Sequence, residues 1–146
     1  MCRHVLPPLL LVILTACGGS TSPPTTSSSS YQGTLDRVCS PVDATGAELH
    51  LSKEAGQGPP LVIIQVWSAE ARSKNQRVFE LSGNARDGSI HLCQSPQECE
   101  LVERGYLYAE ATDSLGPTRG KFWTADGRVN GRFSASRGEA GPPVCG

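Results

Sequence analysis

Residues 121–135 carry the strongest constraint on the fold, two strand-like segments joined by an Asp126-Gly127 turn. An Asp-Gly pair between alternating segments favours a tight β-hairpin, because both residues tolerate the backbone angles of such turns. The return segment alternates small or apolar residues with polar ones, which places Arg128 and Arg132 on one face. This part of the chain therefore predicts two neighbouring antiparallel strands.

Further β signals precede this hairpin. Period-two alternation over residues 47–52 predicts a half-buried strand, and the β-branched run over residues 61–67 predicts a central strand covered on both faces. A second hairpin is expected to join residues 79–81 to 90–92 through a turn at Asp87-Gly88. Residues 106–111 supply another strand.

These segments together define the expected fold class. Seven or eight short strands separated by turn residues predict an all-β domain, residues 31–146, built as a small antiparallel sandwich or barrel. Gly131 indicates a bend or bulge in its strand. The polar residues 68–76 fit either a short helix or an exposed loop.

The start of the chain has the organisation of an export signal. A weakly basic start is followed by an apolar run over residues 5–14, shorter than the roughly 20 apolar residues of a spanning helix. The run ends in Leu14-Thr15-Ala16-Cys17, which resembles the lipobox of bacterial lipoproteins. The resemblance covers this segment alone, and an ordinary secretory signal with a chance cysteine is the alternative.

The lipobox resemblance implies a membrane anchor at Cys17. In that class residues 1–16 are removed, a diacylglycerol is attached to the Cys17 sulfur, and an N-acyl chain is added to the new amino terminus. Each buried methylene contributes about 0.8 kcal/mol, so several chains hold a protein firmly on a membrane. Gly18, where an aspartate would imply inner-membrane retention, implies passage to the outer membrane of the bacterial cell envelope.

Residues 17–30 follow as an expected tether. Positions 20–30 contain only Ser, Thr and Pro, which offer no apolar groups for a core, so we expect a disordered spacer. Mucin-like glycosylation is the alternative interpretation of this composition.

Four cysteines lie in the expected domain, namely Cys39, Cys93, Cys99 and Cys145. In an exported domain an even number predicts two disulfides, for which three pairings exist. We favour Cys93 with Cys99 as a stapled loop, which leaves Cys39 to pair with Cys145. A zinc site is disfavoured because five residues separate the close pair, and the same spacing argues against a Cys-x-x-Cys redox site.

Signatures of catalysis are weak. His50 and His91 both occupy the polar phase of strand-like segments, and the chain has neither a Gly-x-Ser-x-Gly nor a His-Glu-x-x-His motif. Glu98, Glu100 and Glu103 could supply a carboxylate pair for glycoside hydrolysis, but a solvated acidic loop is the favoured explanation. We expect neither an enzyme nor a metal or cofactor, apart from the covalent lipid.

A basic stretch in the C-terminal hairpin is the candidate binding site. Its cations and a neighbouring aromatic ring could bind an anionic glycan, a lipid headgroup or an acidic protein loop, and the residues selected are Lys121, Trp123, Arg128 and Arg132. A solvated face that discourages edge pairing is the alternative. The chain has thirteen Lys and Arg residues, and removal of Arg3 with the signal leaves twelve cations against fourteen carboxylates. This charge balance does not indicate nucleic-acid binding.

Three functional hypotheses follow. The leading one is a non-enzymatic, membrane-anchored lipoprotein whose β-domain binds an envelope protein or anionic polymer through the C-terminal hairpin. The second is an inhibitor or immunity-type lipoprotein that blocks a hydrolase by inserting the stapled loop between Cys93 and Cys99. The third is a small hydrolase that uses Glu100 or Glu103.

Overall fold

The computed structural model of this chain describes residues 28–41, 45–53, 61–67, 78–110, 117–139 and 145. Its strands are β1 (Ser29–Cys39), β2 (Thr45–Lys53), β3 (Leu61–Val66), β4 (Val78–Leu81), β5 (Gly88–Ser95), β6 (Glu98–Val102), β7 (Gly105–Ala109), β8 (Thr118–Thr124) and β9 (Asn130–Arg137). Cys17, residues 1–16, most of the predicted tether and residues 68–76 lie outside the described residues. β1 begins at Ser29, two positions before the predicted start of the domain.

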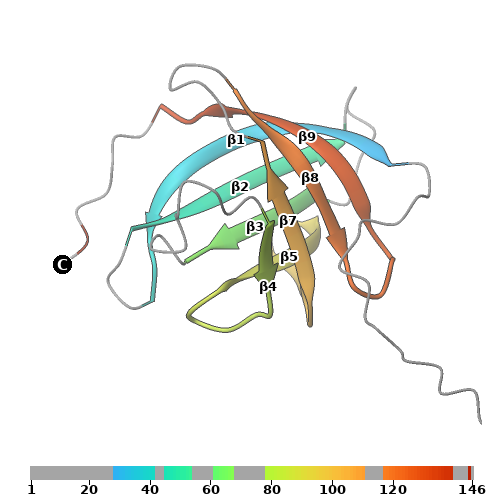
Figure 1. The fold of residues 1–146 in the computed structure, drawn as a ribbon, viewed down its shortest axis with the longest axis horizontal. Coiled ribbons are helices and arrows are strands. Elements are labelled where there is room, and N and C mark those ends of the chain that lie inside the picture. The colour runs from blue at the N-terminus through green and yellow to red at the C-terminus, as the bar shows by residue number, and fades with distance from the viewer. Residues whose placement is uncertain are drawn as a thin grey trace, which may run out of the picture.

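The described residues are all-β, as predicted, and form one curled sheet with the order β4-β7-β8-β9-β1-β2-β3-β5-β6 (Figure 1). Neighbouring strands are antiparallel except for β1 and β9, which run parallel, so the sheet is mixed and not purely antiparallel. The parallel pair joins the first described strand to the last. No described helix is long and apolar enough to cross a membrane.

β4, at one end of the sheet, approaches β5, the next-to-last strand at the other end, and we call this contact the seam. The Gly83 amide donates a hydrogen bond of 2.9 Å to the Gly88 carbonyl, and Asn84 and Gly88 form an isolated bridge. The predicted turn at Asp87-Gly88 exists, but the predicted hairpin is wrong, because β4 pairs with β7 while β5 pairs with β3 and β6. The turn carries the chain across the seam to the other end of the curled sheet.

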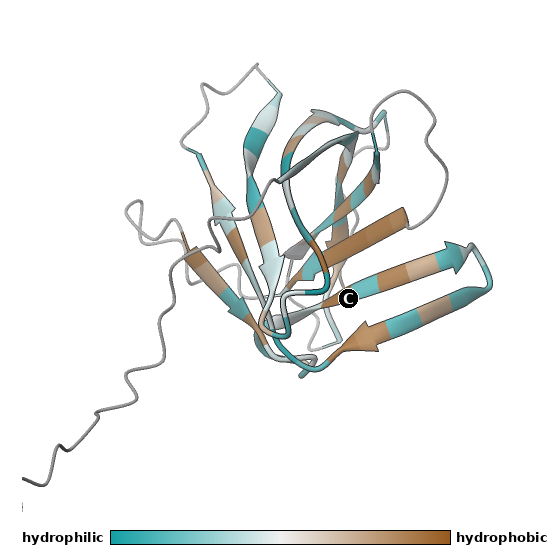
Figure 2. Ribbon diagram, turned by 90° about the vertical axis from the view of Figure 1, so that its right-hand side faces the viewer, coloured by the Kyte–Doolittle hydropathy of each residue, from teal (hydrophilic) through white to brown (hydrophobic). Residues whose placement is uncertain are grey.

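The core fills the inner face of the curl. Hydrophilic and hydrophobic residues alternate along the strands (Figure 2), and the inward set includes Leu51, Val62, Ile64 and Phe122, each at most 1% exposed. β3 is central as predicted, but only one of its faces is fully buried, since a single curled sheet has one inner and one outer face. Gln65 lies on the outer face of β3 and is half-buried.

Gly131 occupies a regular position in β9, so the predicted bend or bulge is absent there. It pairs in register with Phe122 on β8 and with Ser29 on β1. A Cβ at this position would lie 2.6 Å from the ring of Tyr31 and 3.0 Å from Phe122. Glycine is therefore required here by the close approach of two aromatic rings, which themselves meet edge to face.

Both predicted disulfides are confirmed, Cys39–Cys145 and Cys93–Cys99. Cys39 ends β1, and Cys145 follows β9 by eight positions. Because β1 and β9 are parallel, their carboxyl ends lie at the same edge of the sheet, so the first bridge ties the two ends of the domain together. The second bridge links directly paired residues of β5 and β6.

Candidate functional site

Arg128 lies in the turn between β8 and β9, because β9 begins only at Asn130. The turn is organised by Asp126, whose Oδ1 accepts hydrogen bonds from Thr124 Oγ1 at 2.5 Å and from the Arg128 amide at 3.0 Å. Gly127 takes a φ of 72° at its tip. The predicted hairpin is confirmed, but Arg128 does not share a strand face with Arg132 as predicted.

The charges of this turn stabilise one another. Partial burial of the Asp126 carboxyl opposes its ionisation, yet hydrogen bonds from Thr124 and from the amide and guanidinium of Arg128 lower the pKa of Asp126 below its ordinary value. The Arg128 pKa is raised, first by its hydrogen bond to Glu100 and then by Asp126. Arg128 is thus held in place by two carboxylates.

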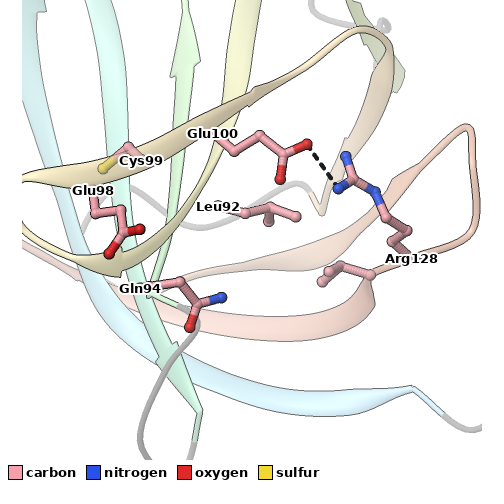
Figure 3. A pocket seen from close by; sticks show the side chains of 7 residues that line it. Leu92, Gln94, Glu98, Cys99, Glu100 and Arg128 are labelled. Carbon is pink, nitrogen blue, oxygen red and sulfur yellow. Dashed lines mark hydrogen bonds and ion pairs between the residues drawn. The ribbon is translucent and has the colours of Figure 1, made fainter.

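Arg128 connects this turn to β6. Its Nη1 lies 2.8 Å from Glu100 Oε1, while its Nε lies 2.5 Å from Asp126 Oδ2. Figure 3 shows Arg128 and Glu100 reaching toward each other from two separate ribbons. Two candidate sites that are distant in the sequence, the basic hairpin and the stapled loop, therefore meet in space.

A hollow of about 330 Å³ lies beside this ion pair and is lined by apolar, polar and charged side chains. The side chains around it include Leu92, Gln94, Glu98, Glu100, Arg128 and Val129. A second hollow of about 400 Å³ lies on the far side of the same pair, where Glu103, Arg104, Ala125 and Asp126 contribute to its walls. Glu100 and Arg128 line both hollows.

The three glutamates weighed for hydrolysis are all exposed. Glu100 is engaged by Arg128, and Glu98 and Glu103 flank it along the same chain segment. A general-acid carboxyl in a glycosidase instead occupies an apolar, desolvated environment. The structure thus brings these carboxylates together at a surface suited to contact with cations.

The outer face of β8 and β9 carries the two other selected cations, Lys121 and Arg132, together with Arg119. Lys121 and Arg132 are directly paired across the two strands, and Arg119 lies two positions from Lys121 on the same face of β8. Among the described residues, no ion pair includes any of these three side chains. We call these three residues the basic face.

Trp123 was selected as a possible binding residue, but its ring is buried. It stacks on Tyr106 with the ring centroids 5.3 Å apart and is only 4% exposed. Its ring thus offers little surface to a partner and serves to pack β7 against β8.

A chain of polar side chains crosses the outer face of β2, β3 and β5, and sequence inspection missed it. His50 Nε2 lies 2.5 Å from Glu48 Oε1, Gln65 Nε2 lies 2.6 Å from Glu48 Oε2, and Ser89 Oγ lies 2.8 Å from Gln65 Oε1. His91 Nε2 lies 2.9 Å from the same Ser89 oxygen. Each of these residues occupies a polar position in the alternating pattern of its strand, which can be recognised in the sequence. The pairing of Glu48 with Gln65 and of Gln65 with Ser89 depends on the strand register, which the sequence pattern does not show.

The hydrogen bonds in this chain have a direction. A carboxylate at Glu48 accepts hydrogen bonds only, so the Gln65 amide nitrogen faces it and the Gln65 carbonyl faces Ser89. The Ser89 hydroxyl therefore donates to Gln65, and its oxygen accepts from the Nε2–H of His91. His91 in this arrangement does not withdraw the serine proton, as a general base in nucleophilic catalysis would.

Metal ligands do not cluster within the described ranges. No group of three or more His, Cys, Asp or Glu side chains there could hold a metal ion, and Cys39, Cys93, Cys99 and Cys145 are all in disulfides. No protein-family model matches this chain, and no curated protein or solved structure shows significant similarity to it.

Proposed function

We propose that this chain is a lipid-anchored protein of the bacterial cell envelope, without enzymatic activity, whose β-domain binds an anionic partner through the basic face. The observation that carries the proposal is the direct pairing of Lys121 with Arg132 across β8 and β9. Like charges directly opposite each other destabilise a sheet, and no carboxylate among the described residues lies within 4 Å to offset them.

A bound anion would remove this repulsion. Phosphate or carboxylate groups of an envelope polymer, or the acidic side chains of an envelope protein, have the required charge. The formal net charge of the whole chain is −1, so the attraction would be local to the basic face and sensitive to salt.

Site-specific crosslinking tests the binding surface. A photo-crosslinking residue at Ser134, which lies opposite Arg119 and next to the cations, should form adducts with envelope components in cells that carry the full-length chain. Lys121→Glu with Arg132→Glu should abolish these adducts. The matched control, Arg37→Glu with Arg86→Glu, makes the same charge change at two exposed positions elsewhere and should retain them. Adducts that persist unchanged in both double variants would exclude the basic face.

The anchor is tested separately. In Triton X-114 phase separation the wild-type chain should enter the detergent phase, whereas Cys17→Ser should remain in the aqueous phase or keep its uncleaved signal. Metabolic labelling with palmitate should mark the wild type alone. Labelling of Cys17→Ser at the wild-type level would show that Cys17 is not the lipid attachment site.

A further inference from the structure

We propose that the free edge of β6 is a docking site for an extended segment of a partner protein that carries lysine or arginine at alternate positions. The partner segment would add one strand to the sheet beside β6. This surface is separate from the basic face and has the opposite charge.

β6 has the properties of an open edge. Among the described residues, it is the last strand of the sheet and pairs with β5 alone. Its residues Glu98 to Leu101 are all exposed, and Leu101 is 50% exposed. Edge strands are commonly protected by proline or by charged side chains. β6, with the sequence ECELV, has no proline, and its two charges are both negative, so they repel an anionic or like-charged strand but not a cationic one.

The two hollows together run along this edge. One reaches from Glu98 to Glu100, the other from Glu100 to Arg104, and the β8–β9 turn forms the opposite wall of both. We call this combined space the β6 groove. The Glu100–Arg128 ion pair crosses the groove at its middle. No described strand lies beyond β6 in the sheet.

Charge selects the occupant of the β6 groove. Its walls carry Glu98, Glu100, Glu103 and Asp126 against Arg104 and Arg128. Both arginines already form ion pairs, Arg104 with Glu80 at 3.3 Å and Arg128 with Glu100 and Asp126. Glu98 and Glu103 form no ion pair with another described residue, so the groove is left with unneutralised carboxylates that favour a cationic segment.

A second copy of this chain is a poor occupant of the same groove. Pairing β6 with β6 would place glutamates of one copy against glutamates of the other, and such like-charge pairs destabilise a sheet. A partner strand with cations at alternate positions matches Glu98 and Glu100, which both point toward the first hollow (Figure 3). Residues between those cations would face the opposite side, where Leu101 is exposed and favours an apolar side chain.

Arg128 occupies the position that a partner's cation would take. Its guanidinium contacts Glu100 from across the groove, so docking requires this exposed ion pair to open. Surface ion pairs of this kind contribute little free energy, so opening it costs little. The geometry therefore points to Arg128 as an internal competitor for the groove.

Hydrogen exchange with a synthetic probe tests this inference. The probe is the peptide acetyl-Lys-Thr-Lys-Val-Lys-Thr-Lys-amide, added to the oxidised full-length chain in detergent. We expect added protection of backbone amides in residues 98–104, and none with the peptide in which every lysine is glutamate. A probe with N-methylated backbone amides on its pairing side should also fail, because strand addition depends on main-chain hydrogen bonds.

Two sets of variants separate docking from general charge attraction. Glu98→Lys with Glu103→Lys should weaken probe binding by about tenfold or more, whereas the control Glu110→Lys with Glu139→Lys, which makes the same charge change outside the groove, should have little effect. Arg128→Ala should strengthen binding by about threefold, because the internal competitor is removed. Lys121→Glu with Arg132→Glu should leave probe binding intact, so the basic face and the β6 groove can fail independently.

Three results would overturn the inference. They are an absence of protection in residues 98–104 at a probe concentration of about 1 mM, equal binding of the N-methylated probe, and equal weakening by both glutamate double variants. Unchanged thermal unfolding and intact disulfides in each variant verify that the comparison is made between folded proteins.

Discussion

Arg128 and Glu100 are 28 positions apart in the sequence, yet their side chains meet at 2.8 Å and join the β8–β9 turn to the edge of β6. The two side chains are 45% and 62% exposed, so water and salt weaken their attraction. The ion pair therefore contributes little to stability, but its position divides the β6 groove into two hollows that would otherwise be continuous.

Removing this ion pair should have a small effect on stability. We expect Glu100→Gln to lower the free energy of unfolding by about 1 kcal/mol or less, since exposed pairs gain little in water. Urea titrations at low and high salt should show the difference shrinking as salt rises. The control is Glu98→Gln, a neighbouring glutamate that forms no ion pair with another described residue. A loss above about 2 kcal/mol would mean that the pair holds the sheet closed.

The two disulfides should contribute unequally to stability. Cys39–Cys145 closes a sequence separation of 106 and Cys93–Cys99 a separation of 6. Chain-entropy estimates give about 5 kcal/mol for the first and about 2 kcal/mol for the second. Paired Cys→Ala variants, compared by thermal unfolding, should therefore show the larger loss without the Cys39–Cys145 bridge. An equal or reversed ranking would contradict the estimate.

The polar chain on the outer face predicts the tautomer of His91. With Ser89 donating to Gln65, neutral His91 should carry its proton on Nε2, which long-range ¹⁵N–¹H correlation spectra detect directly. Gln65→Leu removes the acceptor for the Ser89 proton, which frees Ser89 to donate to His91 and should increase the Nδ1–H form. An Nδ1–H tautomer in the wild type would show that the hydrogen bonds run in the other direction.

Asp126 should make stability depend on pH in the acid range. Its pKa in the folded state lies below the ordinary value of about 3.9, so the ionised carboxylate stabilises the fold above that pH. This contribution is lost as the pH falls through the lower, folded-state pKa. Asp126→Asn should therefore be less stable than the wild type near pH 7, by well under about 1 kcal/mol because solvent screens the 43% exposed carboxylate, and the difference should vanish at strongly acid pH.

Urea titrations across that pH range measure this effect. Glu139→Gln, at an exposed position outside the turn, is the control for loss of one negative charge. A constant difference between wild type and Asp126→Asn down to pH values well below about 3 would show that Asp126 acts through packing and not through its charge.

Local features of the fold were predictable from sequence because their signals are local. Alternation over residues 47–52 and the Asp126-Gly127 turn each depend on a few neighbouring residues, and both occur as predicted. The disulfide pairing followed from spacing, since Cys93 and Cys99 could close a short loop. The hairpin predicted around Asp87-Gly88 failed because a turn sets the direction of the chain but does not select the strand's partner.

The candidate site was predictable only in pieces. Arg128 was selected as a cation and Glu100 as a carboxylate, but their encounter depends on how far the sheet curls. The contacts of His50 and His91 likewise require the register of β2, β3 and β5.

The sequence by itself determined the β character and the turn positions and favoured one of three cysteine pairings, because these arise from residue preferences and short spacings. Only the tertiary structure decided the strand order, the parallel contact of β1 with β9, the seam and the β6 groove. Those features arise from contacts between residues far apart in the chain, whose geometry is set by the twist and curl of the whole sheet.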